Sequence, residues 1–262
     1  MINTHPLVSV KTLTDYHLES FLKCPYKFYF QHILMLNSGQ VKWRQVVQSI
    51  INQVVHNFYQ LPPNAQNQLN IMKLIDRYWK HVSPKVFESK IHYYMVLAKT
   101  TDHLLQYLSM EKKQKPPLFL YQKLNIYIAE LETQLSLTFD LAEWTPDSFT
   151  VRKWLVEADE ELIQLYNHLI VVFSHEAFGK IPEKIEIITL LDGQKYTFSP
   201  TMNKVTQGMM YLEYMKSLLQ RPNDYSKTSS KTECKTCSFA HKCKNSINNF
   251  KRTNNLNENY LH

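Results

Sequence analysis

The four cysteines are the residues whose type and spacing point most directly to chemistry. Cys234, Cys237 and Cys243 form the pattern C-x2-C-x5-C, and Cys24 lies near the other end of the chain. Two cysteines with two residues between them can direct both thiolates at one centre, and four thiolates suit zinc or an iron–sulfur cluster. Three cysteines in a polar, Lys-rich segment are poor core material. We therefore predict a metal centre that staples the two ends of the chain together.

Other roles for these thiols are less favoured by the sequence. Residues 1–11 lack the apolar run of a signal peptide, and no apolar stretch approaches the roughly 20 residues that cross a bilayer. We expect a cytoplasmic protein without a membrane partner, a setting in which structural disulfides are rare. Structural zinc sites usually pair two C-x2-C knuckles, so we favour a [4Fe–4S] cluster and keep zinc as the alternative.

The composition is that of an ordinary soluble domain. The chain has 262 residues, of which 44% are hydrophobic, and only 4 are glycine. No glycine-rich phosphate-binding motif is present, which argues against nucleotide-cradling proteins. The formal charge of +7 fits a polyanionic partner without requiring one.

The hydrophobic pattern of the elements that must position the cysteines changes from helical to strand-like along the chain. Helical periodicity dominates up to about Glu111, and Thr12 or Thr14 can cap the first helix, near Asp15. Strand-like alternation follows, then a helix, a hairpin around Asp192-Gly193 and a last helix. The expected strands and later elements lie at 119–129, 133–142, 148–155, 159–173, 185–198 and 200–220.

This order predicts a single α/β domain over 1–262 with a helical N-terminal half. Its expected parts are a helical region at 12–117, an α/β core at 118–220, a cysteine cluster at 221–244 and a polar tail at 245–262.

The segments around the cysteines resemble a known family. "LESFLKCPYKFYFQHIL" and "ECKTCSFAHKC" are similar to the iron–sulfur, RecB-like branch of the PD-(D/E)XK nucleases. This branch includes the nuclease domain of the AddB helicase–nuclease subunit and the CRISPR adaptation nucleases. The resemblance spans about Leu13 to Cys243. It implies a restriction-endonuclease-like mixed sheet flanked by helices, and a [4Fe–4S] cluster on the four cysteines.

The resemblance also implies catalytic residues. His56 in "INQVVHNFY" and Asp140 in "LSLTFDLAEW" correspond to ligands of Mg²⁺ or Mn²⁺, although Asn52 and Leu137 replace the glycines of those motifs. Lys153 in "FTVRKWL" corresponds to the lysine that orients water and stabilises developing charge. Gln164 and Tyr166 correspond to the Gln and Tyr of the following helix.

One residue departs from the family pattern. Val151 stands where a second metal-binding carboxylate is expected, which leaves Mg²⁺ with too few anionic oxygens. Glu157 or Glu143 could supply a carboxylate from a displaced position. Otherwise the site is inactive and the fold serves binding.

Three functions therefore stay open. The first is a metal-dependent DNA exonuclease acting on single strands or ends, as the family implies. The second is a catalytically inactive DNA-binding or complex-forming homologue, whose helicase or other protein subunit would be a separate chain. The third is a zinc-stapled α/β protein without a nucleic-acid role. Basic and aromatic residues near the cysteines could face DNA or keep an anionic cluster soluble, namely Lys23, Tyr26, Lys27, Tyr29, Lys231, Lys235, Lys242 and Lys244.

Overall fold

The computed structural model describes residues 9–36, 42–109, 116–235, 237–245 and 260–261. Its α-helices are α1 (Asp15–Lys23), α2 (Pro25–Phe28), α3 (Trp43–Gln60), α4 (Gln68–Trp79), α5 (Lys90–Ser109), α6 (Glu160–Phe178), α7 (Met202–Leu219), α8 (Lys231–Lys235) and α9 (Ala240–Asn245). Its strands are β1 (Ser9–Val10), β2 (Thr12–Thr14), β3 (Phe119–Ile128), β4 (Thr133–Trp144), β5 (Phe149–Leu155), β6 (Lys184–Thr189), β7 (Gln194–Phe198) and β8 (Tyr260–Leu261). A π-helical turn, Tyr29–Ile33, follows α2.

The main sheet is mixed and is organised around β4. Strand β3 pairs antiparallel along β4, while the other edge of β4 is shared by β2, which is parallel, and β5, which is antiparallel. Strand β6 continues the sheet parallel to β5, and β7 closes it as an antiparallel hairpin. The fold is therefore α/β with an open sheet that contains both kinds of pairing.

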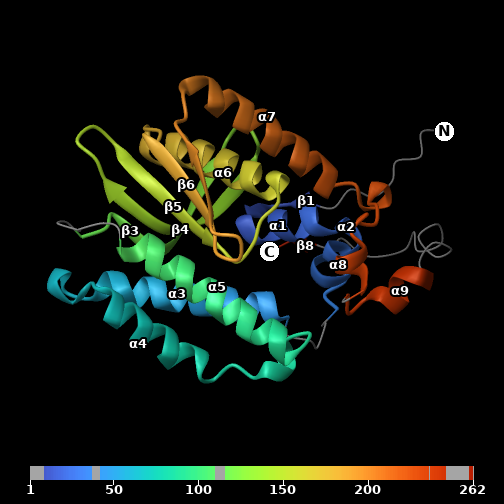
Figure 1. Cartoon of the computed structure of the whole chain (residues 1–262). Helices are drawn as coiled ribbons and strands as arrows, with labels where there is room; N and C mark the ends of the chain where they lie inside the picture. The colour runs from blue at the N-terminus through green and yellow to red at the C-terminus, as the bar shows by residue number, and fades with distance from the viewer. Residues whose placement is uncertain (1–8, 37–41, 110–115, 236, 246–259, 262) are drawn as a thin grey trace, which may run out of the picture.

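Helices cover both faces of this sheet. Figure 1 shows α6 and α7 against one face and α3, α4 and α5 against the other. Each face buries its own apolar cluster: Phe139 and Phe173 belong to the α6 side, and Phe58, Leu104 and Trp154 belong to the α3 side. The central strands therefore bury side chains on both faces of the sheet.

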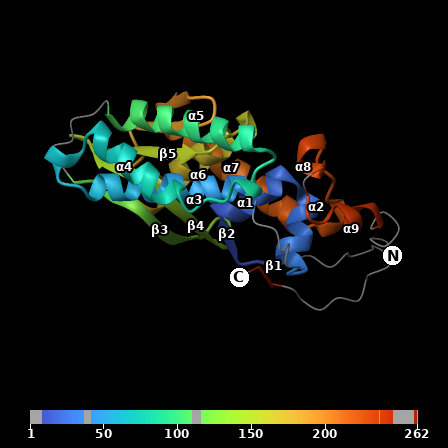
Figure 2. The ribbon, with the colours of Figure 1, turned by 60° about the horizontal axis from the view of Figure 1, so that its bottom comes forward.

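Helix α1 joins the sheet to the cysteine-bearing end of the molecule. Thr14 caps it by accepting a hydrogen bond from the His17 backbone N–H at 3.0 Å. The chain leaves the helix at Cys24, whose backbone is extended, and Pro25 then opens α2 at a position that tolerates proline. Figure 2 shows α2, α8 and α9 together at this end.

The predicted strands, the hairpin and the cap at Thr14 are confirmed by the structure. The N-terminal region differs from the prediction of purely helical structure over 12–117, because Thr12–Thr14 forms β2. Just before the region predicted to be helical, Ser9–Val10 forms β1, which pairs with β8 of the predicted polar tail. The rest of that tail, 246–259 and 262, lies outside the described residues. Within the part of the chain that the structure describes, no helix combines the length and apolar character needed to cross a bilayer.

Candidate active site and cysteine pocket

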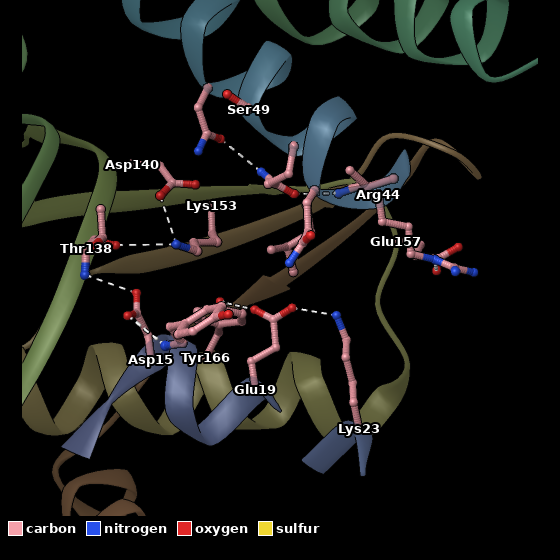
Figure 3. Close-up of a pocket in the computed structure, with 16 residues that line it drawn as sticks. Asp15, Glu19, Lys23, Arg44, Ser49, Thr138, Asp140, Lys153, Glu157 and Tyr166 are labelled. Carbon is pink, nitrogen blue, oxygen red and sulfur yellow. Dashed lines mark hydrogen bonds and ion pairs between the residues drawn. The ribbon is translucent and has the colours of Figure 1, made fainter. Parts of the chain in front are cut away.

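A cavity of about 440 Å³ lies where α1, α3 and α6 meet the middle of β4 and the end of β5 (Figure 3). Its walls carry an unusual share of charged and amide side chains for an internal hollow. The lining residues that bear on chemistry are Asp15, Glu19, Lys23, Arg44, Gln48, Asn52, Asp140, Lys153, Glu157 and Tyr166.

Asp140 and Lys153 form the centre of this cavity. The two side chains come from adjacent antiparallel strands, and Lys153 Nζ lies 2.8 Å from Asp140 Oδ1. The backbone N–H of Trp154 donates to the other carboxylate oxygen at 3.0 Å. Asp140 is 3% exposed and Lys153 is 7% exposed, so the ion pair is almost completely removed from water.

Burial and mutual attraction set the charges of this pair. Burial raises the pKa of Asp140, although Lys153 and the Trp154 N–H both favour the carboxylate. Burial also opposes the charged form of Lys153, but the carboxylates of Asp140, Asp15 and Glu19 outweigh it and raise the pKa of Lys153. The lysine is therefore held as a cation inside an acidic pocket.

Two of those carboxylates come from α1, one helical turn apart. Asp15 Oδ2 accepts a hydrogen bond from the Thr138 backbone N–H at 3.2 Å. Glu19 accepts one from the Tyr166 hydroxyl at 2.9 Å and pairs with Lys23 at 2.5 Å. Burial opposes the charged form of Glu19, but the attraction of Lys23 and the hydrogen bonds from Lys23 and Tyr166 outweigh it and lower the pKa of Glu19. Figure 3 shows Tyr166 between Asp15 and Glu19, all on the same side of Lys153.

Not every residue predicted from the sequence reaches this cavity. Asp140, Lys153 and Tyr166 line it, whereas His56 and Gln164 do not. Val151 is 2% exposed and belongs to the apolar cluster on the α6 face, so its side chain serves the core.

His56 packs against a residue that the sequence did not single out. Its ring lies 5.9 Å from that of Tyr121, and its Nε2 lies 2.9 Å from the amide nitrogen of Gln60. Asn52 and Gln48, one and two turns earlier on α3, face the cavity instead.

Tyr121 stands opposite Asp140 in β3, between the pairs Leu120–Leu141 and Gln122–Phe139. Its φ of +47° is in the left-handed region, which is strained for an aromatic residue. Its buried hydroxyl has no hydrogen-bond partner among the described residues. Burial, and next the Asp140 carboxylate, raise the pKa of Tyr121 well above its usual value. No pattern in the sequence signals this backbone geometry.

The two displaced carboxylates proposed from sequence lie in different places. Glu157 borders the cavity and is ion-paired with Arg44. Glu143 does not border it, and its carboxylate lies 3.9 Å from Arg152. Asp15 and Glu19 were not predicted as site residues. The sequence feature that could have indicated them is their spacing of four, which places both carboxylates on one face of the helix before Cys24.

The four cysteines surround a second cavity, of about 210 Å³, between α2, α8 and α9. All four are free thiols. Phe30 of the π-helical turn packs on Phe239 with 5.6 Å between ring centroids, which seats the C-terminal cysteines beside Cys24.

The thiols share this cavity without forming a tight single-ion cage. Burial raises the pKa of Cys243, Lys227 opposes this, and the other three cysteines add to the increase. Among the described residues, no three His, Cys, Asp or Glu side chains are grouped closely enough to hold one metal ion. Thiolates on one zinc ion lie roughly 3.8 Å apart, given its tetrahedral bonds of about 2.3 Å. The four thiols therefore line one cavity, but in this structure they are not grouped closely enough to coordinate one ion.

Comparisons with known proteins leave the identity of the chain open. No protein-family model and no curated protein matches it. Among solved structures it is similar to one described as the crystal structure of SSO0001, with 11% sequence identity and a TM-score of 0.33. That match covers 88% of this chain and 85% of the other. A TM-score this low decides neither fold family nor function.

Proposed function

We propose that this chain is a DNA-processing phosphodiesterase of the PD-(D/E)XK type, with a restriction-endonuclease-like sheet and a [4Fe–4S] cluster. The observation that carries the proposal is the meeting of Asp140 and Lys153 in a cavity that also holds Asp15 and Glu19. Carboxylates beside a cationic lysine in a hollow are the groups that metal-assisted phosphodiester hydrolysis uses.

The residues of the cavity divide these roles between them. Asp140 would hold a divalent cation, and Asp15 or Glu19 would supply the second carboxylate that Val151 lacks. Mg²⁺ commonly uses one or two carboxylates and completes its shell with water and substrate phosphate. When bound, such an ion polarises the phosphate and lowers the pKa of its water.

Lys153 is placed to stabilise the negative charge that develops on the phosphate, because it is kept cationic inside the cavity. Tyr166 holds Glu19 by a hydrogen bond and lies under the Lys153 ammonium, with 4.7 Å from Nζ to the ring centroid. Both contacts restrain the groups that would meet the substrate.

The cysteine pocket is where the proposed cluster would be bound. Each cysteine of a [4Fe–4S] cluster binds a different iron, so the thiolates stand further apart than around zinc. What supports a shared centre is that all four thiols line one cavity. It would be held by Cys24, Cys234, Cys237 and Cys243 and would link α1 to the C-terminal segment.

A cleavage assay tests the proposed activity. Anaerobically purified protein should degrade labelled DNA with Mg²⁺ or Mn²⁺, and Asp140→Asn or Lys153→Met should reduce the rate by about 100-fold or more. Glu143→Gln is the matched control, because it removes a carboxylate on the same strand outside the cavity. A cleavage rate that is unchanged in Asp140→Asn would contradict the proposal.

A second candidate is a non-catalytic DNA-binding homologue, and one contact favours it. Lys153 Nζ lies 2.8 Å from Asp140 Oδ1 and 3.4 Å from the Thr138 carbonyl oxygen, so an ammonium group already occupies oxygens that a metal could use. Salt-sensitive DNA binding by wild-type protein with no cleavage in either metal would favour this candidate.

A further inference from the structure

The Asp140 cavity opens into two neighbouring hollows of opposite charge. One, of about 100 Å³, lies between α1, α2 and the start of α3, and shares Tyr16, Glu19, Lys23, Arg44 and Gln45 with the cavity. The other, of about 670 Å³, lies toward the start of α6 and residues 228–230, and shares Glu19, Lys23, Arg44 and Glu157. We call them the α2 branch and the α6 branch.

Their side chains suit different ligands. The α2 branch carries four cations and one carboxylate, namely Lys23, Lys27, Lys42, Arg44 and Glu19. The α6 branch carries five carboxylates and two cations, namely Glu19, Glu157, Asp159, Glu160, Glu161, Lys23 and Arg44. A polyanion is attracted by the first and repelled by the second, although the second is larger.

We propose that one strand of nucleic acid reaches the Asp140 cavity along the α2 branch, with Lys42 and Lys23 contacting its phosphates. This inference rests on the proposed function for the identity of the ligand, and it adds the path and the contacting residues. A duplex is far larger than a hollow of about 100 Å³, so the strand that follows the branch is single.

An exposed aromatic residue stands where the branch meets the cavity. Tyr16 borders both and is 49% exposed. Its hydroxyl accepts a hydrogen bond from the Gln31 side chain at 3.0 Å, and its ring meets that of His32 edge-on, with 5.4 Å between centroids. Aromatic rings beside basic side chains are the usual platform on which single-stranded bases stack.

Binding measured without added divalent metal tests this path apart from catalysis. The probe is a fluorescein-labelled 20-nucleotide oligo(dT), followed by fluorescence polarisation over a range of salt. Lys42→Glu should weaken binding about tenfold and lower the salt slope by roughly 0.7, the value expected when one single-strand phosphate is no longer neutralised. Tyr16→Ala should weaken binding about fivefold or more, and Tyr16→Phe should not, because it keeps the ring.

Matched variants identify the path. Lys204→Glu makes the same charge change on the exposed face of α7, and Glu161→Gln removes a carboxylate from the α6 branch; both should change the affinity less than twofold. Wild-type affinity in Lys42→Glu and Tyr16→Ala would overturn the inference, as would tighter binding of a blunt duplex than of oligo(dT).

The two proposals fail separately. Loss of binding in these variants without any cleavage by wild-type protein would keep the path and reject the enzyme. Cleavage by wild-type protein with unchanged binding in the variants would reject only the path.

Discussion

Asp140 and Lys153 depend on each other for their charged states. Both are almost fully buried, and each has the other as its nearest counter-ion. A buried pair of this kind contributes little net stability, but removing one partner leaves the other charge without compensation. Keeping two ionisable groups out of water costs free energy. Because apolar side chains would fill a purely structural core without that cost, the buried pair points to a functional role for Asp140 and Lys153.

Replacing one partner should therefore destabilise the fold more than replacing both. Lys153→Met should lower the free energy of unfolding by about 3 kcal/mol, because the buried Asp140 carboxyl must then protonate or remain unpaired. Lys153→Met with Asp140→Asn should recover a large part of that loss. Urea denaturation of the two single variants and the double variant measures it, and strictly additive losses would show that the pair is not coupled.

At the scale of elements, α1 connects the two candidate sites. Asp15 and Glu19 line the Asp140 cavity, and Cys24, at its C-terminal end, lines the cysteine pocket. Its other side meets the π-helical turn, where the rings of His17 and His32 lie 4.8 Å apart. Nδ1 of His17 and Nε2 of His32 are buried and lack hydrogen-bond partners in the described part of the chain.

This contact makes the packing of α1 sensitive to acid. Burial, and then the nearby His17 and Lys27, lower the pKa of His32 from 6.5 to about 4. As the pH falls below about 6.5, the unfolded chain binds this proton while the folded chain does not. Its contribution to stability is therefore complete above that pH and is lost progressively down to about pH 4.

Between pH 7 and pH 5 this loss should be about 1 kcal/mol, less than the full shift in pKa would give, because His32 is only partly buried and solvent screens its charge. The His32→Phe variant keeps a ring at the position and should lose correspondingly less stability over the same interval. Unfolding free energies from urea titrations at the two pH values provide the comparison. Equal losses in both proteins would show that His32 is not the titrating group.

At the scale of the whole molecule, the cysteine pocket joins segments from opposite ends of the sequence. Cys24 follows the first helix, whereas the other three thiols lie on or beside α8 and α9. A group bound to all four closes a loop of nearly the entire chain, and such closure stabilises a fold by restricting the unfolded state.

Loss of one ligand should therefore release the C-terminal segment. Under the proposed cluster, anaerobically purified Cys24→Ser should contain much less iron than wild-type protein, and limited proteolysis should cut it faster within 221–245. Chelation of iron from wild-type protein should have the same effect. About four iron atoms per chain in wild-type protein would support the proposed cluster. One zinc ion per chain would instead show that the cysteines bind zinc.

Local sequence patterns predicted the central strands well and the N-terminal segment less well. The alternation in residues 133–142 is strong because every second residue of β4, Leu135, Leu137 and Phe139, packs into the same apolar cluster on the α6 side. Thr12–Thr14 is too short to show alternation, and it becomes a strand because its backbone pairs with Gln134–Ser136 of β4. A pairing with so distant a segment leaves no local signal in a three-residue strand.

The amino-acid sequence alone pointed to the four thiols, to Asp140 and Lys153 on predicted neighbouring strands, and to the absence of a carboxylate at Val151. Which groups surround them became known only from the assembled fold. The fold brings Asp15 and Glu19 to Lys153 and turns His56 toward Tyr121. Periodicity reports the local backbone, whereas distances between remote side chains depend on how helices pack on the sheet, and that packing places α1 beside the cavity.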